Sequence, residues 1–339
     1  MADTERLGRH RQEPPTATGP ANRQRRVWLI ATIGCAVLVA VALVFVVPVV
    51  QGKPGATSGG IGSFTLPTKP DSYLGWYPSG VPASYAGVTA LTAAIGVKPS
   101  VVPYYSGWLE PFQPGFAKTV ADNGAVLLVQ MDPKNISIGA IAAGRYDSYL
   151  RTYADNVHAY RHPVILSFGH EMNGYWYSWS YKQTKPAVFV AAWRHIVTLF
   201  RQRGVDNVTW MWTVNIIDDP YYGEIHNPSP WWPGKSYVTW VGIDGYYYHP
   251  STTFTSLFGP TIAAVREITT APILISETSI APAAGQSAKI TDLFAGIHLY
   301  GLLGLVWFDV PHPEDWRLTN PAAIAEFRQE ARKYKGASS

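Results

Sequence analysis

Short apolar runs recur along the chain and alternate with longer segments of mixed apolar and polar residues. The runs are rich in β-branched and aromatic residues, which favours strands. They occupy residues 72–77, 100–105, 125–131, 163–169, 207–213, 237–244, 272–276 and 302–308. The intervening segments have helical composition, most clearly at 143–160, 185–203, 255–268, 286–299 and 320–335. Strands that alternate with helices predict a parallel sheet with crossover helices.

The number and spacing of these runs narrow the fold class further. Eight strands over about 270 residues are typical of a closed (β/α)8 barrel, which usually takes about 250 residues. An open, doubly wound sheet is the alternative, but no G-x-G-x-x-G follows the first strand. The sequence therefore predicts an α/β fold of the (β/α)8 TIM-barrel type for residues 70–335.

A different pattern precedes the barrel. The segment from Val27 to Val50 contains no charged residue, and a helix of that length would rise about 36 Å, enough to cross a hydrocarbon core of about 30 Å. A cleaved signal peptide is the alternative, although its apolar region is usually only about 7–15 residues long. The six arginines within residues 1–26 predict that this end is cytoplasmic.

These features predict four parts of the chain. We expect a disordered cytoplasmic tail at 1–26, a single transmembrane anchor at 27–50, a flexible Gly/Ser/Pro/Thr-rich linker at 51–69 and the barrel domain at 70–335. The chain would then be a single-pass protein of the cell membrane, with its barrel domain outside the cell.

Charge and cysteine usage exclude several classes of function. Of the net charge of +4, residues 1–26 carry +3, so the rest of the chain is nearly neutral and lacks the basic excess of a nucleic-acid-binding protein. The single cysteine, Cys35, lies inside the uncharged segment, so neither a disulfide framework nor a cysteine metal cluster is expected. We expect no metal and no cofactor. The 13 tryptophans and 20 tyrosines suit a surface that stacks flat ligands as well as a core.

The most unusual stretch runs from Pro163 to Trp179 and reads PVILSFGHEMNGYWYSW. Its apolar strand ends in a glycine, and His170 and Glu171 follow at once. A carboxylate at the end of a buried strand costs solvation free energy unless it is hydrogen-bonded or has a task, and barrel enzymes place their chemistry at that end. A capped strand is the simpler alternative. A zinc site of the HExxH type is excluded, because Gly174 occupies the position of the second histidine.

A second carboxylate, Glu277, directly follows the predicted seventh strand in the run PILISET. Two carboxylates at the ends of barrel strands around one cavity are what the cleavage of a glycosidic bond requires. One protonates the departing oxygen, and the other attacks the anomeric carbon or activates water. In retaining enzymes the two carboxyl groups lie about 5–5.5 Å apart.

The run HEMNGYWYSW, with IDGY and ISET downstream, resembles glycoside hydrolase family 26, whose best-known members are endo-β-1,4-mannanases. The resemblance covers roughly residues 70–335. It implies a retaining double displacement in which Glu171 is the acid/base and Glu277 is the nucleophile. It further implies that five residues contact the sugar or orient these groups: His170, Trp176, Asp244, Tyr246 and, as the platform under the sugar ring, Trp307.

The expected function is therefore cleavage of β-1,4-linked mannan or glucomannan outside the cell, with a polysaccharide as the partner. A β-1,3-1,4-glucanase or another β-glycanase on the same scaffold is the alternative. A transglycosylase acting on a cell-surface polysaccharide uses the same glycosyl-enzyme intermediate, so the sequence does not separate it from a hydrolase. A sugar-binding module is a further alternative, but a binder has no need of paired carboxylates.

Overall fold

The computed structural model describes residues 64–217, 225–311 and 314–336. The predicted cytoplasmic tail, the predicted transmembrane segment and most of the predicted linker lie outside the described residues. Among the residues described, no helix combines the length and apolar character needed to cross a membrane.

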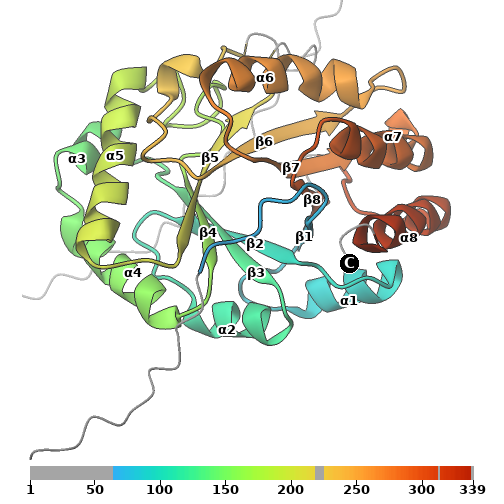
Figure 1. Cartoon of the computed structure of the whole chain (residues 1–339), viewed down its shortest axis with the longest axis horizontal. Coiled ribbons are helices and arrows are strands. Elements are labelled where there is room, and N and C mark those ends of the chain that lie inside the picture. The colour runs from blue at the N-terminus through green and yellow to red at the C-terminus, as the bar shows by residue number, and fades with distance from the viewer. Residues whose placement is uncertain (1–63, 218–224, 312–313, 337–339) are drawn as a thin grey trace, which may run out of the picture. The chain divides into compact units, whose positions relative to one another are not determined.

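Eight parallel strands pair in chain order and close into a barrel, which confirms the predicted fold (Figure 1). The strands are β1 (Tyr73–Pro78), β2 (Val101–Gly107), β3 (Val126–Asp132), β4 (Val164–Phe168), β5 (Val208–Asn215), β6 (Trp240–Tyr247), β7 (Ile273–Ile280) and β8 (Gly304–Asp309). Each corresponds to one of the eight predicted apolar runs. Because all strands are parallel, the segments that follow them emerge at the same end of the barrel.

Helices surround the barrel in Figure 1. They are α1 (Ala86–Ile95), α2 (Pro114–Asp122), α3 (Ile138–Ala142), α4 (Asp147–Tyr160), α5 (Pro186–Gln202), α6 (Phe254–Ile268), α7 (Gln286–Leu299) and α8 (Pro321–Gly336). The five predicted helical segments correspond to α4 to α8. The three that the sequence analysis did not identify are the shortest, at five to ten residues, so each offers few positions from which to recognise a helical period.

Inward-facing side chains near the starts of the strands form an apolar cluster that is separate from the outer core. It takes one residue from every strand: Tyr73, Val101, Leu128, Ile165, Met211, Trp240, Leu274 and Val306. We call this set the inner apolar layer. A layer of this kind makes the middle of a barrel a packed core rather than a pore.

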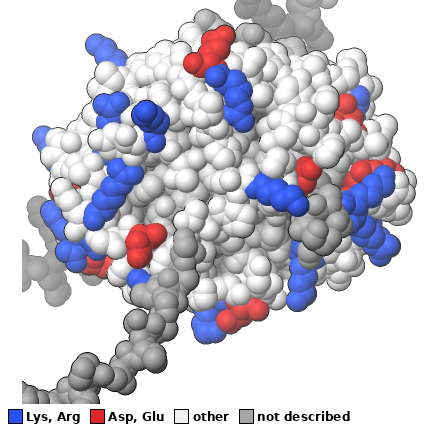
Figure 2. Space-filling view, in the orientation of Figure 1, with Lys and Arg blue, Asp and Glu red and all other residues white. Residues whose placement is uncertain are grey.

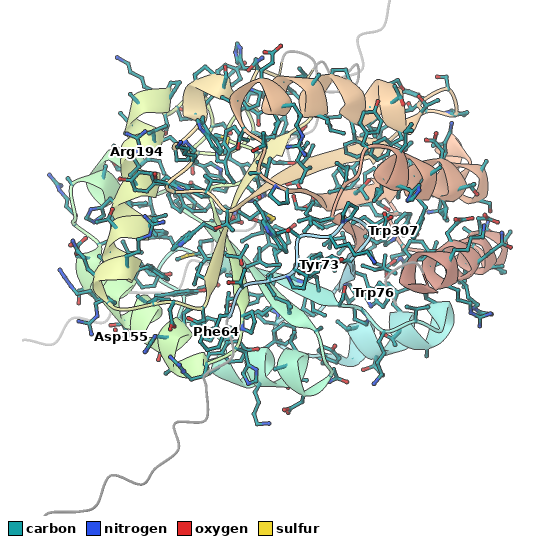
Figure 3. All side chains as sticks on the ribbon, viewed as in Figure 1. Phe64, Tyr73, Trp76, Asp155, Arg194 and Trp307 are labelled. Atoms are coloured by element: carbon teal, nitrogen blue, oxygen red, sulfur yellow. The ribbon has the colours of Figure 1, made fainter. Side chains whose placement is uncertain are left out.

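The segment before β1 packs against this layer. Leu66 is only 7% exposed and belongs to the same cluster, and the Tyr73 hydroxyl donates a hydrogen bond to the carbonyl oxygen of Pro67 at 2.9 Å. Figure 3 labels Phe64 and Tyr73 in this part of the molecule. The packed domain therefore begins before residue 70, where the sequence analysis placed the end of a flexible linker.

One step further along the strands the inward-facing residues become polar. Strand alternation brings Gln130, Ser167, Thr213, Asp244 and Ser276 into the interior. We call this set the inner polar layer. The hydroxyl groups of Ser167 and Thr213 are 2.9 Å apart, and the Ser276 hydroxyl donates to Asp244 Oδ1 at 2.6 Å. This layer lies between the inner apolar layer and the ends of the strands.

Candidate active site

Glu171 follows β4 in a tight turn. Its backbone has φ of +55°, the left-handed region that costs a residue with a side chain on the order of 1–3 kcal/mol. The preceding Gly169 also has positive φ, and the Glu171 amide donates to the Thr213 carbonyl at 3.1 Å. The turn directs the carboxyl group of Glu171 into the mouth of the barrel instead of along the strand.

Both carboxyl oxygens of Glu171 accept hydrogen bonds. Asn215 Nδ2 donates to Oε1 at 2.5 Å, and Trp176 Nε1 donates to Oε2 at 2.7 Å. The indole reaches this position because residue 174 is glycine. A Cβ there would lie 2.5 Å from the Trp176 ring. The glycine-broken, aromatic run of the sequence therefore has a direct role in holding Glu171.

Glu277 reaches the same cavity through an irregularity in β7. Ile275 pairs with Ile243 of β6, but the next β6 residue, Asp244, pairs with Glu277, so Ser276 is an extra residue. Such a bulge allows the consecutive residues Ser276 and Glu277 both to face the interior. The hydroxyl groups of Tyr105 and Tyr246 donate to Glu277, one to each carboxyl oxygen.

The two glutamates line one cavity of about 360 Å³ at the C-terminal end of the barrel. Its remaining wall is an amide and a set of aromatic rings: Tyr175, Trp176, Tyr177, Asn215, Tyr246, Tyr248, Phe308 and Trp316. Larger hollows of about 500 and 490 Å³ lie elsewhere on the described surface, and neither contains Glu171 or Glu277. The cavity of about 360 Å³ therefore combines paired carboxyl groups with an aromatic wall.

Burial shifts the ionisation of both glutamates. It raises the pKa of Glu277 to about 7, with a further increase from the charge of Glu171, against the lowering effect of His170, Tyr105 and Tyr246. It also raises the pKa of Glu171, against the effects of His170, Asn215 and Trp176. Two neighbouring buried carboxyl groups resist simultaneous ionisation, so near neutral pH the pair can supply one proton donor and one carboxylate.

His170 and Asp244 lie beside the glutamates but behind the cavity wall. His170 is 2% exposed, with Nδ1 2.9 Å from Asp132 Oδ1 and Nε2 3.0 Å from the Tyr177 hydroxyl. Asp244 is fully buried, and burial raises the pKa of its carboxyl group well above the usual range. Neither residue lines the cavity; His170 contacts Tyr177, which does, and Asp244 accepts a hydrogen bond from Ser276, which adjoins Glu277.

The predicted sugar platform at Trp307 is wrong. Trp307 is fully buried and packs edge-on against Phe327 of α8, with ring centroids 5.4 Å apart. Figure 3 shows it near Trp76, its register partner in β1, on the helix side of the barrel. Neighbouring residues of a strand face opposite sides, and here it is Phe308 that faces the cavity. The ring of Phe308 stacks on the ring of Tyr77, with the ring centroids 5.2 Å apart.

The structure brings together the other predicted site residues: Glu171, Glu277, His170, Trp176, Asp244 and Tyr246. It adds residues that the sequence analysis did not assign: Tyr105, Asp132, Tyr177, Asn215, Phe308 and Trp316. Tyr105, Asp132 and Asn215 lie at or near the C-terminal ends of β2, β3 and β5. Counting inward positions from the strand ends would have identified them.

Among the described residues, no group of histidine, cysteine, aspartate and glutamate side chains is arranged to hold a metal ion. The charged side chains on the face drawn in Figure 2 lie mainly toward its edge, and lysines and arginines are interspersed with acidic residues there.

Comparison with known proteins agrees with this chemistry. Residues 142–296, which include both glutamates, match the model of "Glycosyl hydrolase family 26". Endoglucanase H of Acetivibrio thermocellus is 28% identical over 286 residues, which is 79% of this chain and 31% of that protein. Mannan endo-1,4-beta-mannosidase A and B of Caldalkalibacillus mannanilyticus is 28% identical over 88 residues, 24% of this chain and 16% of that protein. The chain thus spans about a third or less of the length of these relatives.

Among solved structures, the chain resembles the catalytic domain of a Bacillus sp. JAMB-750 endo-beta-1,4-mannanase. The TM-score is 0.60 at 16% sequence identity, and the match covers 78% of this chain and 84% of that one. At this level of identity the likeness establishes the shared barrel fold.

Proposed function

We propose that the chain, whose residues 142–296 match the model of glycosyl hydrolase family 26, is a retaining enzyme of that family that cleaves β-1,4-linked mannan or glucomannan. The observation that carries the proposal is the pair of buried glutamates, Glu171 and Glu277, in one aromatic-walled cavity. Each carboxyl oxygen of this pair accepts a hydrogen bond from a neighbouring side chain, so the pair is held in a defined geometry.

Glu277 is the nucleophile in this proposal. The hydroxyl groups of Tyr105 and Tyr246 stabilise its ionised form, which is the form that can attack an anomeric carbon. Attack breaks the glycosidic bond with inversion and leaves the sugar bonded to Glu277 through a carboxylate oxygen.

Glu171 is the acid and then the base. Burial favours its protonated form, so it can give a proton to the departing oxygen. The resulting carboxylate then removes a proton from water, which attacks the glycosyl-enzyme with a second inversion. Two inversions give net retention, and the proton balance of Glu171 is restored.

The aromatic wall supports a flat-faced glycan as the substrate. Tyr175 and Trp176 follow β4, whereas Phe308 lies in β8 and Trp316 follows it. Rings therefore approach the glutamates from two sides of the barrel mouth. Pyranose rings with equatorial substituents present C–H faces that pack well on such rings. The named mannosidase relative and the family's mannanases support mannan or glucomannan.

A β-glucan is the second candidate substrate. The match to Endoglucanase H extends over 79% of the chain, whereas the match to the mannosidase extends over 24%. Mannose and glucose units differ only in the orientation of the 2-hydroxyl, so a few groups beside the anomeric carbon decide between the two.

We also propose that the enzyme acts outside the cell, attached to the membrane by the uncharged segment from Val27 to Val50. The proposal rests on the length of that segment and on the arginines before it. Protease added to intact cells should remove the catalytic domain from the cell surface. A catalytic domain that is protected until the cells are broken would contradict this location.

The substrate proposal is tested by incubating the purified enzyme with linear mannan, glucomannan, mixed-linkage β-glucan and β-1,3-xylan in parallel. We expect mannan and glucomannan to be cut to short oligosaccharides, with Glu277→Gln as the control for contaminating activity. Rapid cleavage of the mixed-linkage glucan with untouched mannan would replace mannan by β-glucan and leave the proposed chemistry intact.

A further inference from the structure

Three side chains in contact with one another form a series from β3 to the cavity wall. Asp132, the last residue of β3, contacts His170 Nδ1 at 2.9 Å, and His170 Nε2 contacts the hydroxyl of Tyr177 at 3.0 Å. Tyr177 lines the cavity that holds both glutamates, whereas His170 does not. His170 therefore connects the side chain of Asp132, at the end of β3, to a phenol on the cavity wall.

Neighbouring residues hold this series of three side chains in place. The Trp179 indole donates to the backbone carbonyl of His170 at 2.7 Å. The rings of Tyr177 and Trp179 stack on each other, with their centroids 4.2 Å apart and an angle of 11° between their planes. His170 is 2% exposed, so its ring has little contact with water. Its two nitrogens are therefore confined to the partners that the structure gives them.

The protonation state of His170 decides what Tyr177 can offer to a ligand. A neutral ring that donates to Asp132 through Nδ1 must accept the Tyr177 proton at Nε2, and Tyr177 then presents only lone pairs to the cavity. A charged ring donates from both nitrogens. The oxygen of Tyr177 then accepts from Nε2, and its own proton is free to point into the cavity.

We propose that Asp132 is a positioning residue that keeps the His170 ring in its charged form. The hydroxyl group of Tyr177 can then donate a hydrogen bond to an oxygen atom of the bound sugar. The part of this proposal that concerns a bound sugar rests on the proposed function, whereas the part that concerns the charge of His170 does not. Asp132 is not among the residues that line the cavity, and its side chain contacts His170 directly, so we assign it a positioning role.

The groups that face His170 support a charged ring. The acidic groups are Asp132, the adjacent residue Glu171, Asp244 of β6 and Glu277 of β7. The phenols are Tyr177 and Tyr105 of β2, and the ring centroids of Tyr105 and His170 are 5.5 Å apart. Burial works against a charge on His170, but the acidic groups, led by Asp132, raise the pKa of the imidazole to about 10. Asp132 is the carboxylate that hydrogen-bonds the ring.

A charged His170 also affects the catalytic pair, since it lowers the pKa of both Glu171 and Glu277. Replacing Asp132 by asparagine would remove the carboxylate and, on this proposal, the charge of His170. His170 adjoins Glu171 and influences it more strongly than Asp132 does, so the net result is a higher pKa for both glutamates. If His170 stayed charged, only a negative charge would be lost, and both pKa values would fall.

The first experiment observes His170 directly and needs no substrate. The chain contains nine histidines, so nitrogen NMR of the full chain with ¹⁵N-labelled histidine would be assigned with a His170→Asn variant. We expect the His170 ring to be charged at pH 8 in the parent, neutral in Asp132→Asn and charged again in Asp132→Glu. A neutral ring in the parent, or a charged ring in Asp132→Asn, would overturn the proposal.

A second histidine–aspartate pair supplies a matched control. His195 Nε2 lies 2.6 Å from Asp147 Oδ1 on the helical side of the barrel, and the two side chains are 28% and 25% exposed. Asp147→Asn should change the His195 signal and leave the His170 signal and the pH dependence of catalysis as they are. A change in either of the latter would show that the effect is not specific to Asp132.

The second experiment measures kcat/KM against pH on whichever β-glycan the enzyme cleaves. We expect both limbs of the profile to move to higher pH in Asp132→Asn and to return in Asp132→Glu, even if kcat does not recover fully. We expect Tyr177→Phe to lower kcat/KM about tenfold, the loss of one hydrogen bond to the substrate, while the limbs stay near their parent positions. An unchanged or acid-shifted profile in Asp132→Asn would refute the proposal. An enzyme inactive on every glycan would refute the proposed function and leave the NMR result to decide the state of His170.

Discussion

Along a single strand, the interior of this barrel changes its character within a few residues. In β4, Ile165 belongs to the inner apolar layer, Ser167 belongs to the inner polar layer, and Glu171 follows in the turn beyond the strand. In β6 the sequence of inward positions is Trp240, Gly242, Asp244 and Tyr246. The same eight strands thus carry an apolar layer at one end and the proposed catalytic groups at the other.

One end of the barrel stabilises the fold, whereas the other end lowers its stability. The apolar layer buries one hydrophobic side chain from each strand and stabilises the closed barrel. At the other end, Glu171, Asp244 and Glu277 are buried carboxyl groups whose pKa values are raised, so their ionisation costs folding free energy. We infer that the first region maintains the strand positions from which the second region can hold groups that oppose folding.

The largest effects should follow from removing the glutamates. Glu171→Ala should lower kcat by roughly 10²- to 10⁴-fold, the usual contribution of a general acid/base, and Glu277→Ala should lower it further because the nucleophile is lost. Both variants should unfold at or above the parent temperature near neutral pH, because each removes a carboxyl group whose burial raises its pKa. Steady-state kinetics and thermal unfolding by circular dichroism would test this. For Glu171 the substrate must have a poor leaving group, and near-parent turnover would contradict the assignment.

A cavity in the inner apolar layer should produce the reverse pattern. Ile165 is fully buried, so Ile165→Ala should lower the free energy of unfolding by about 2–5 kcal/mol. Turnover per folded molecule should stay close to that of the parent, since Ile165 lies below the inner polar layer. Chemical denaturation followed at several wavelengths would give the stability, and active-site titration would give the folded fraction. A large loss of kcat in the folded fraction would show that the two regions are not separable.

Loss of one donor to Glu277 should have a smaller effect with a defined pH dependence. The Tyr105 hydroxyl stabilises the carboxylate form of Glu277, so Tyr105→Phe should raise the pKa of Glu277 above its parent value of about 7. Because Glu277 must be ionised to attack, the acidic limb of kcat/KM should move to higher pH, with about a tenfold loss at its maximum. An acidic limb that moves to lower pH would contradict the role of Tyr105.

The smallest effects should separate the two neighbouring aromatic residues of β8. Phe308 faces the cavity, so Phe308→Ala should raise KM a few-fold, in keeping with about 1 kcal/mol of ring stacking. Trp307 packs against α8, so Trp307→Phe should lower stability by about 0.5–3 kcal/mol and leave KM unchanged. Measuring KM and unfolding for both variants tests the assignment of faces. A raised KM in the Trp307 variant would contradict the packing that the structure shows.

Sequence reasoning identified the eight strands because each is a distinct apolar run, and it identified α4 to α8 because they are long. It located Glu171 and Glu277 from their positions just beyond two of these runs. The platform at Trp307 came from the family resemblance, and it fails because Trp307 and Phe308 are neighbours in β8 and therefore face opposite sides of the strand. The sequence run was taken as 302–308, and the observed strand is Gly304–Asp309.

The partners of the site residues were less accessible to sequence reasoning. Tyr105 is 172 residues from Glu277, and Asp132 is 38 residues from His170, so only the closed barrel brings these pairs together. The bulge that turns both Ser276 and Glu277 inward depends on the register between β6 and β7. No local pattern in PILISET indicates an extra residue at this point.

The roles of the two glutamates are tested most directly by the configuration of the product that Glu277→Ala forms with azide and an activated aryl β-glycoside. A small anion can occupy the space that the carboxylate leaves and attack the anomeric carbon from the same face. If Glu277 is the nucleophile of a retaining mechanism, NMR should show an α-glycosyl azide, whereas Glu171→Ala should give the β-azide through the intact glycosyl-enzyme. A β-azide from Glu277→Ala, or an α-azide from Glu171→Ala, would contradict the assignment.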